Sequence, residues 1–141
     1  FSAALGVKKS DIVAHQWVAN GINWCAIMLD SAQKVLDLTP DLAALSGDLL
    51  GVVGPYPNGG ECDIEVRSFV VPMGINEDPV TGSLNAGLAM WLTRSGMMKD
   101  RYVASQGTIL GRKGRVYVEK RSEDIWVGGD VIICVDGQVT V

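Results

Sequence analysis

The sequence has little of the material from which metal sites and nucleophilic triads are built. It contains one histidine, His15, and three cysteines, Cys25, Cys62 and Cys134, among 141 residues. The cysteines lie too far apart along the chain to form a zinc motif or a redox pair. A lone histidine among apolar neighbours is typical of a structural side chain. We therefore expect no metal site and no Ser-His-Asp triad.

The sequence also lacks long hydrophobic runs and an excess of positive charge. Its longest clean apolar run, Trp24 to Leu29, is closed by Asn23 and Asp30, whereas a membrane span needs about 20 apolar residues. Twelve basic and sixteen acidic residues give a net charge of −4. This balance argues against electrostatic binding to nucleic acid or to a membrane surface.

The cysteines are read as free thiols in a reducing cytoplasm, because nothing in their spacing predicts a disulfide. Cys25 and Cys134 lie in apolar, β-branched stretches and are expected to be buried. Cys62 stands beside a polar turn and is expected to be more exposed.

What the sequence has in quantity is apolar surface. Residues of apolar type make up 48% of the chain, and its length suits one domain over residues 1–141 with a substantial core. The mean hydropathy of +0.21 is high for a small domain, and the first residue is Phe1. We expect a piece of a longer chain, with an apolar face that meets something else.

Turn residues divide the chain into many short predicted strands. The dipeptide Asn20-Gly21 predicts a hairpin, and the alternation from Cys62 to Val71 is the clearest mark of a half-buried strand. A short helix from Leu42 to Leu45, capped by Thr39, is expected as well. The predicted strands are 12–18, 22–29, 33–38, 49–54, 62–71, 102–110, 115–120, 125–127 and 131–135.

One predicted helix, residues 84–94, has almost no polar face. A helix that is apolar all round is buried all round. Leu88, Trp91 and Leu92 should therefore be almost fully buried. The sequence predicts an α+β domain, in which a barrel-like and mostly antiparallel sheet wraps around this central helix.

The start of that helix gathers the side chains best suited to chemistry: Asp78, Thr81, Gly82 and Ser83. The first amide groups of a helix have no partners within it, and its dipole places partial positive charge there. This arrangement suits a carboxylate or a developing oxyanion. The alternative is purely structural, with a turn at Asp78 and a helix cap from Thr81 or Ser83. Arg67 likewise allows two interpretations, a contact with a substrate carboxylate or an exposed strand arginine.

The segment EDPVTGS at residues 77–83, here called the signature segment, closely resembles the signature of the phenazine-biosynthesis PhzF-like family. That family shares the diaminopimelate-epimerase fold. Further segments match in order along nearly the whole chain. They are Arg67-Ser68-Phe69, Ser105-Gln106-Gly107, Gly111-Arg112 and Gly128-Gly129-Asp130-Val131.

The resemblance implies a protein of two similar halves, of which this chain matches the C-terminal one. The active site would lie in the cleft between the halves, with Asp78 and Ser83 as catalytic residues and Thr81 and Gly82 binding substrate. Family chemistry moves a proton between carbons of a small carboxylate, without metal or cofactor. The main acid/base, a glutamate, would come from the N-terminal half, so this chain alone is expected to be inactive.

Within that resemblance, some features stay open. The signature segment carries Ser83 where a two-thiol racemase would need a cysteine, and serine is a poor base, so hydrogen-bond donation is its expected role. The partners implied are the N-terminal domain and a small carboxylate, and a homodimer is left open. The alternative is a non-catalytic PhzF-like binding or interaction protein.

Overall fold

The computed structural model describes residues 1–45 and 47–140, and its main element is a curled sheet. Within these residues seven strands follow one another across the sheet in chain order. β2 with β3 and β4 with β5 pair parallel, and the other neighbours pair antiparallel, so the mostly antiparallel sheet is confirmed. The strands are β1 (Ile12–Asn20), β2 (Ile22–Leu29), β3 (Leu50–Pro55), β4 (Ile64–Phe69), β5 (Arg101–Gln106), β6 (Gly114–Arg121) and β7 (Asp124–Gly128).

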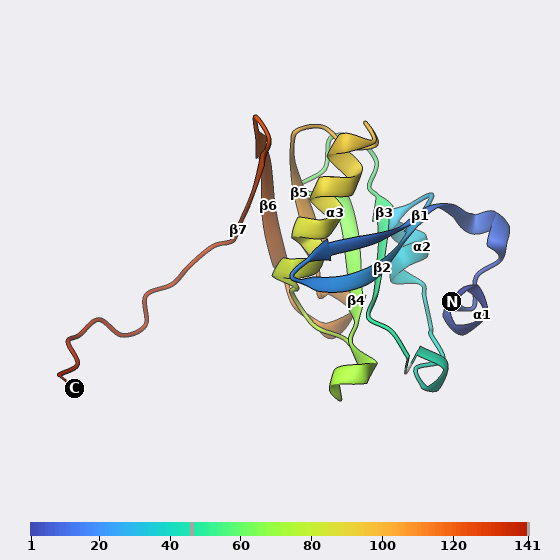
Figure 1. Ribbon diagram of the computed structural model, residues 1–141, viewed down its shortest axis with the longest axis horizontal. Helices are drawn as coiled ribbons and strands as arrows, with labels where there is room; N and C mark the ends of the chain where they lie inside the picture. The colour runs from blue at the N-terminus through green and yellow to red at the C-terminus, as the bar shows by residue number, and fades with distance from the viewer. Residues whose placement is uncertain (46, 141) are drawn as a thin grey trace.

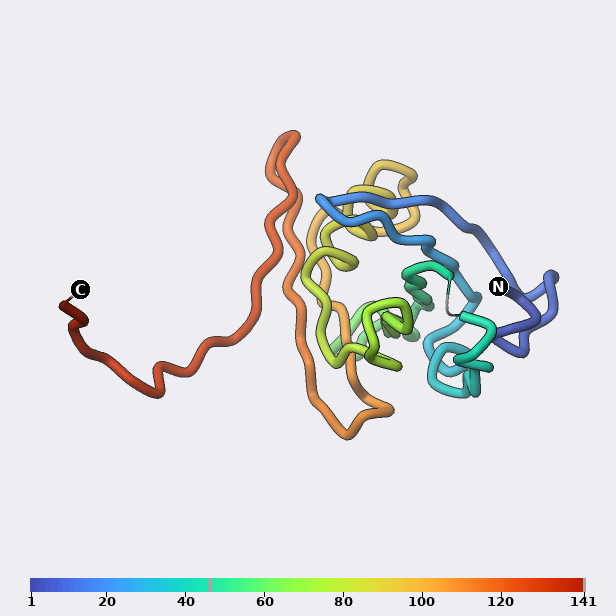
Figure 2. Tube along the Cα trace, turned by 60° about the horizontal axis from the view of Figure 1, so that its bottom comes forward, coloured from blue at the N-terminus to red at the C-terminus, as the bar shows by residue number. Residues whose placement is uncertain are grey.

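The long helix α3 (Gly82–Arg94) lies in the concave face of this sheet (Figure 1). Its contacts reach from β1 and β2 at one edge to β6 and β7 at the other, and Figure 2 shows the chain curling around it. The predicted central helix is therefore confirmed. The shorter helices are α1 (Ser2–Leu5), α2 (Ala32–Leu36) and the 3₁₀ turns η1 (Lys9–Asp11), η2 (Ala43–Leu45), η3 (Val71–Met73) and η4 (Thr108–Leu110).

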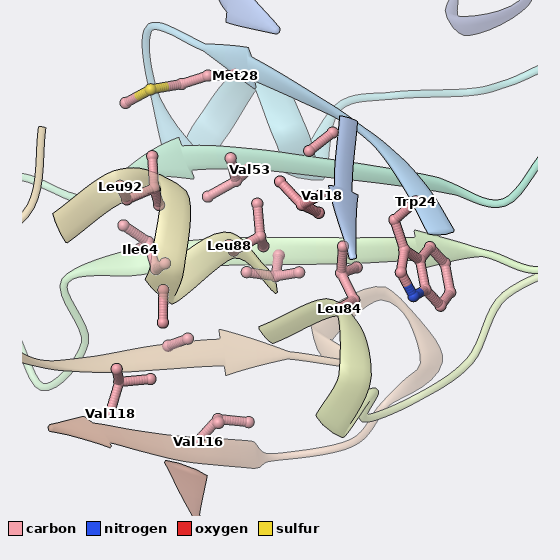
Figure 3. Close-up of a cluster of buried hydrophobic side chains, with 14 of the residues drawn as sticks. Val18, Trp24, Met28, Val53, Ile64, Leu84, Leu88, Leu92, Val116 and Val118 are labelled. Atoms are coloured by element: carbon pink, nitrogen blue, oxygen red, sulfur yellow. The ribbon is translucent and has the colours of Figure 1, made fainter. Parts of the chain in front are cut away.

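The main core fills the space between α3 and the sheet (Figure 3). Leu84, Leu88 and Leu92 repeat every four residues along α3 and are fully buried. They meet inward-facing side chains of the strands, among them Val18, Trp24, Val53, Ile64, Val66, Val116 and Val118. The four-residue spacing places the three leucines on one helix face, and this face packs α3 against the sheet.

The helix is not buried all round, and the expectation for Trp91 is wrong. Met90 and Trp91 are half-buried, and Arg94 is exposed. These residues line a hollow of about 390 Å³ together with Gln16 and Trp17 of β1. Strands β1 and β7 are the two unpaired edges of the sheet, so the sheet curls only part of the way round the helix and leaves this side open.

A second, smaller core covers the other face of the sheet. Side chains of α1 and α2, including Leu5 and Val35, pack there on β2, β3 and β4. The strand predicted at 33–38 is wrong, because these residues belong to α2 and its end. Ser31 accepts a hydrogen bond from the amide of Lys34, and this N-cap starts the helix. The residues that follow lack the alternation of polar and apolar side chains that a strand would show.

Three other local predictions are corrected. The helix predicted from Leu42 to Leu45 is the 3₁₀ turn η2, and its first amides bind the side chain of Asp41 rather than Thr39. The strand predicted at 102–110 ends at Gln106, because Gly107 turns the chain with a φ of 84° into η4. Residues 131–135 form no strand; they run away from the sheet and are exposed (Figure 1).

Both interpretations of Arg67 are wrong, because its side chain is buried and bonded to other groups of the protein. Its guanidinium forms a two-pronged ion pair with Glu77, at 2.9 and 2.7 Å, and donates to the carbonyls of Val35 and Leu38. Planar guanidinium and carboxylate groups match in this geometry. Arg67 therefore ties β4 and α2 to the first residue of the signature segment.

The expected burial of Cys25 is confirmed, whereas the expectations for Cys62 and Cys134 are wrong. Cys25 and Cys62 are buried, whereas Cys134 is exposed in the segment that leaves the sheet. Burial raises the pKa of both the Cys25 and the Cys62 thiol, since a thiolate is poorly solvated there.

A helix with the length and apolarity needed to cross a membrane does not occur in the described part of the chain.

The thiols give a direct test of the fold. At pH 8 the native 141-residue chain should react with Ellman's reagent at one thiol within seconds, and at all three after denaturation in guanidinium. The thiolate is the reactive species, and burial keeps Cys25 and Cys62 protonated. Cys134→Ser should abolish the fast reaction. A second fast thiol in the native chain would contradict the burial of Cys25 or Cys62.

The burial of the α3 leucines predicts that truncating one of them lowers the stability of the domain. Leu88→Ala should lower the free energy of unfolding in urea by about 2–5 kcal/mol, because it removes a buried side chain and leaves a cavity. Leu110→Ala makes the same chemical change at an exposed position and is the matched control. Equal losses for the two variants would be inconsistent with α3 at the centre of the core.

Candidate functional site

The signature segment passes over the start of α3 and presents its polar residues there. Asp78 and Ser83 are half-buried, Thr81 is buried, and Gly82, the first residue of the helix, is exposed. The amide of Asp78 donates to the carbonyl of Ser68 at 2.9 Å, which ties the segment to the end of β4. The structure thus brings the predicted site residues together at one end of the helix, near the surface.

Thr81 occupies the N-cap position but does not cap the helix. Its side chain makes no hydrogen bond to the amides of the first turn. Instead the hydroxyl donates to Oδ2 of Asp78 at 2.6 Å. The structural alternative of a helix cap from Thr81 is therefore wrong. The first amides of α3 keep the partial positive charge of an uncapped helix start.

Ser83 is held by a residue from β2. The indole Nε1–H of Trp24 donates to Oγ of Ser83 at 3.2 Å, and Trp24 itself is buried. A serine hydroxyl has one proton and two lone pairs. Because Ser83 accepts from the indole through a lone pair, its hydroxyl proton can still be donated to an acceptor.

Two buried polar residues at this site escaped the sequence analysis as functional candidates: Asn85 on α3 and Gln106 at the end of β5. Both are fully buried. The side-chain amide of Asn85 donates to the carbonyl of Thr81 at 2.9 Å and to Oε1 of Gln106 at 2.8 Å. The signal was present in the sequence, because Gln106 follows Tyr102 and Ala104 in the inward-facing alternation of a strand.

Glycines let the β5–β6 hairpin press against the signature segment. At Gly107 a Cβ atom would lie 2.6 Å from the carbonyl oxygen of Pro79, and its φ of 84° is itself unfavourable for other residues. At Gly114 a Cβ atom would lie 2.5 Å from the side chain of Val80. The backbone of the hairpin therefore supports the segment at a distance that no side chain allows.

Several exposed apolar side chains belong to the signature segment or to segments next to it. Met73 and Ile75 precede the signature segment, Val80 belongs to it, and Ile109 and Leu110 lie in η4, just beyond Gly107. The hollows beside Trp91, His15 and Tyr56 are lined by other side chains. Val80, Ile109 and Leu110 thus give the polar helix start an apolar border on the side of the signature segment and the β5–β6 hairpin.

Comparison with known proteins matches the chain to relatives of about twice its length. An uncharacterized isomerase of Pseudomonas aeruginosa is 34% identical over 79% of this chain and 42% of its own length. The uncharacterized isomerase YddE of Salmonella typhimurium is 30% identical over 92% of this chain and 50% of its own. A crystal structure of a phenazine biosynthesis protein of the PhzF family from Enterococcus faecalis superposes with a TM-score of 0.71 at 27% identity, covering 91% of this chain and 46% of that one.

The chain spans about half the length of the curated relatives it matches. The model of one family, described as phenazine biosynthesis-like protein, matches residues 1–137. That match covers the curled sheet, α3 and the signature segment. On this evidence the chain belongs to the phenazine biosynthesis-like (PhzC-PhzF) protein family.

Proposed function

We propose that this chain forms one wall of the active site of an isomerase or epimerase that moves a proton between carbons of a small carboxylate substrate. The observation that carries the proposal is the uncapped start of α3, with Asp78 and Ser83 beside it. Relatives of the chain are named isomerases, and one solved structure of the same fold is described as a predicted epimerase.

The helix start suits a negatively charged group. A substrate carboxylate, or the oxyanion of an enolate formed when a proton leaves the neighbouring carbon, would accept hydrogen bonds from the free amides of the first turn. Gly82 is exposed and lets such a group approach the backbone closely. The reaction would need no metal or cofactor, because the amides stabilise the charge that develops.

Asp78 and Ser83 would divide the remaining work. The hydroxyl of Ser83, with a lone pair occupied by Trp24, would donate to the same developing charge. Asp78 accepts from Thr81 through Oδ2, which leaves Oδ1 to orient the substrate or to assist proton transfer. Gly82 would position the substrate through its backbone amide. The amide and carbonyl of Thr81 are already bonded to Gln106 and Asn85, so Thr81 would act by holding Asp78.

The other wall of the site would come from a second, N-terminal half of the same protein. Two observations support that assignment, one from the relatives and one from this chain. The matched relatives are about twice as long, and exposed apolar side chains border the helix start. A domain on that border would exclude water from the site, and it would supply the main acid/base on the far side of the substrate.

A proton-exchange assay tests the assignment of Asp78. The longest natural protein that contains this chain should be incubated with a panel of small carboxylates in deuterated water, and exchange followed by NMR. Asp78→Ala should lower the exchange rate about 10²–10⁴-fold, the usual contribution of a positioned acid or base. Asp100→Ala changes an exposed aspartate elsewhere and should leave the rate unchanged. Wild-type exchange by the Asp78 variant would remove this residue from the mechanism.

The same assay compares the isolated 141-residue chain with the longer protein. The isolated chain should catalyse no measurable exchange, because it lacks the second wall and the acid/base expected there. Loss of positioning alone can cost about 7–11 kcal/mol of activation free energy. Comparable rates for the two proteins would refute the two-wall arrangement. If the longer protein exchanges no proton but binds carboxylates, the non-catalytic binding function is correct instead.

A further inference from the structure

We propose that Gln106 is a positioning residue, which directs the hydroxyl of Thr81 at Asp78 and thereby keeps the start of α3 uncapped. The inference rests on the proposed function, because it assigns Gln106 to the site built by Asp78 and Ser83. Gln106 itself is fully buried and does not reach the surface where a substrate would bind.

The orientation of the Gln106 side-chain amide follows from two backbone groups. Its Oε1 accepts from the amide N–H of Thr81 at 3.1 Å, and its Nε2 donates to the carbonyl of Asp78 at 2.9 Å. A backbone N–H can only donate and a carbonyl can only accept. The oxygen and nitrogen of Gln106 therefore cannot exchange places without breaking both bonds inside the core.

The direction of the Thr81 hydroxyl follows in turn. Nε2 of Gln106 also lies 3.0 Å from Oγ1 of Thr81, and an amide nitrogen can only donate. The threonine oxygen is thus the acceptor in that bond, and its single proton points to Oδ2 of Asp78 at 2.6 Å. Asn85 also donates to Oε1 of Gln106, so all four hydrogen-bonding positions of the glutamine amide are used. We call the Gln106 amide and these partners the hub.

This chain of bonds explains why an N-cap threonine leaves its helix uncapped. Threonine at this position ordinarily accepts from the amides of the first turn. Here Gln106 and Asp78 hold the hydroxyl between them, away from the amides of Ser83 and Leu84. A leucine at position 106 would fill the inward-facing strand position but would leave the amide of Thr81 and the carbonyl of Asp78 without these hydrogen bonds. The buried glutamine therefore serves the helix start rather than the core.

The first test measures the Thr81 rotamer in the 141-residue chain by three-bond NMR couplings. Wild type should show one χ1 rotamer, with the hydroxyl toward Asp78. Gln106→Met keeps a flexible apolar side chain in the core and removes the hub, so Thr81 should turn and cap the helix, shifting the amide signals of Ser83 and Leu84. Thr93→Val is the matched control: it removes a buried hydrogen bond, from Oγ1 to the carbonyl of Ala89, at the other end of the same helix. An unchanged Thr81 rotamer in Gln106→Met would overturn the inference.

The second test measures exchange kinetics in the longer protein. Gln106→Met should lower kcat about 10²-fold, the size of effect that a misplacement of about 1 Å produces. Thr93→Val should leave kcat within twofold. Thr81→Val deletes the hydroxyl while leaving Gln106 in place, so it keeps the inference testable if Gln106→Met does not fold.

A double variant separates positioning from general destabilisation. Because Gln106 acts through Thr81, Gln106→Met combined with Thr81→Val should be no slower than the slower single variant. Multiplicative losses would overturn the inference, since they would mean independent effects. If wild type exchanges no substrate at all, the proposed function fails, while the rotamer measurement still decides whether Gln106 directs Thr81.

Discussion

The packing of α3 against the concave face of the sheet determines where every other part of the candidate site can lie. Leu84, Leu88 and Leu92 fill the core from one helix face, so the helix can neither rotate nor slide without opening cavities. Its start is thereby held beside β2, which brings Trp24 to Ser83, and beside the end of β5, which brings Gln106 to Thr81. The site is precise because its supports belong to the same rigid core.

Around that fixed helix start, several buried polar groups are used to hold a loop rather than to meet a substrate. Arg67 anchors Glu77, Gln106 anchors Thr81 and the carbonyl of Asp78, and Gly107 lets the hairpin backbone approach Pro79. Buried polar groups are costly unless they are satisfied. Hydrogen bonds with β4 and β5 therefore hold the conformation of residues 77–83.

The sequence predicted features that depend on local pattern and missed those that depend on distant partners. The hairpin at Asn20-Gly21 and the apolar helix were predicted because one turn dipeptide or one periodicity decides each of them. A strand was also predicted at β4, but its half-buried character was wrong, because all six of its residues are buried. Arg67 was misread because its partners, Glu77 and the end of α2, come together only in the fold. The resemblance of the signature segment predicted the candidate site residues, whereas the direction of the Thr81 hydroxyl could be assigned only from its partners in the fold.

The segment after β7 has a consequence for the behaviour of the chain on its own. Residues 131–135 read Val-Ile-Ile-Cys-Val and are exposed. They follow a sheet whose outer strands, β1 and β7, each have one unpaired edge. Short β-branched runs without charge or proline add readily to such edges. Asp130 and Asp136 bracket the run on either side, and acidic residues in such positions act as gatekeepers against strand addition. Loss of these two carboxylates is therefore expected to favour self-association of the isolated chain through this run.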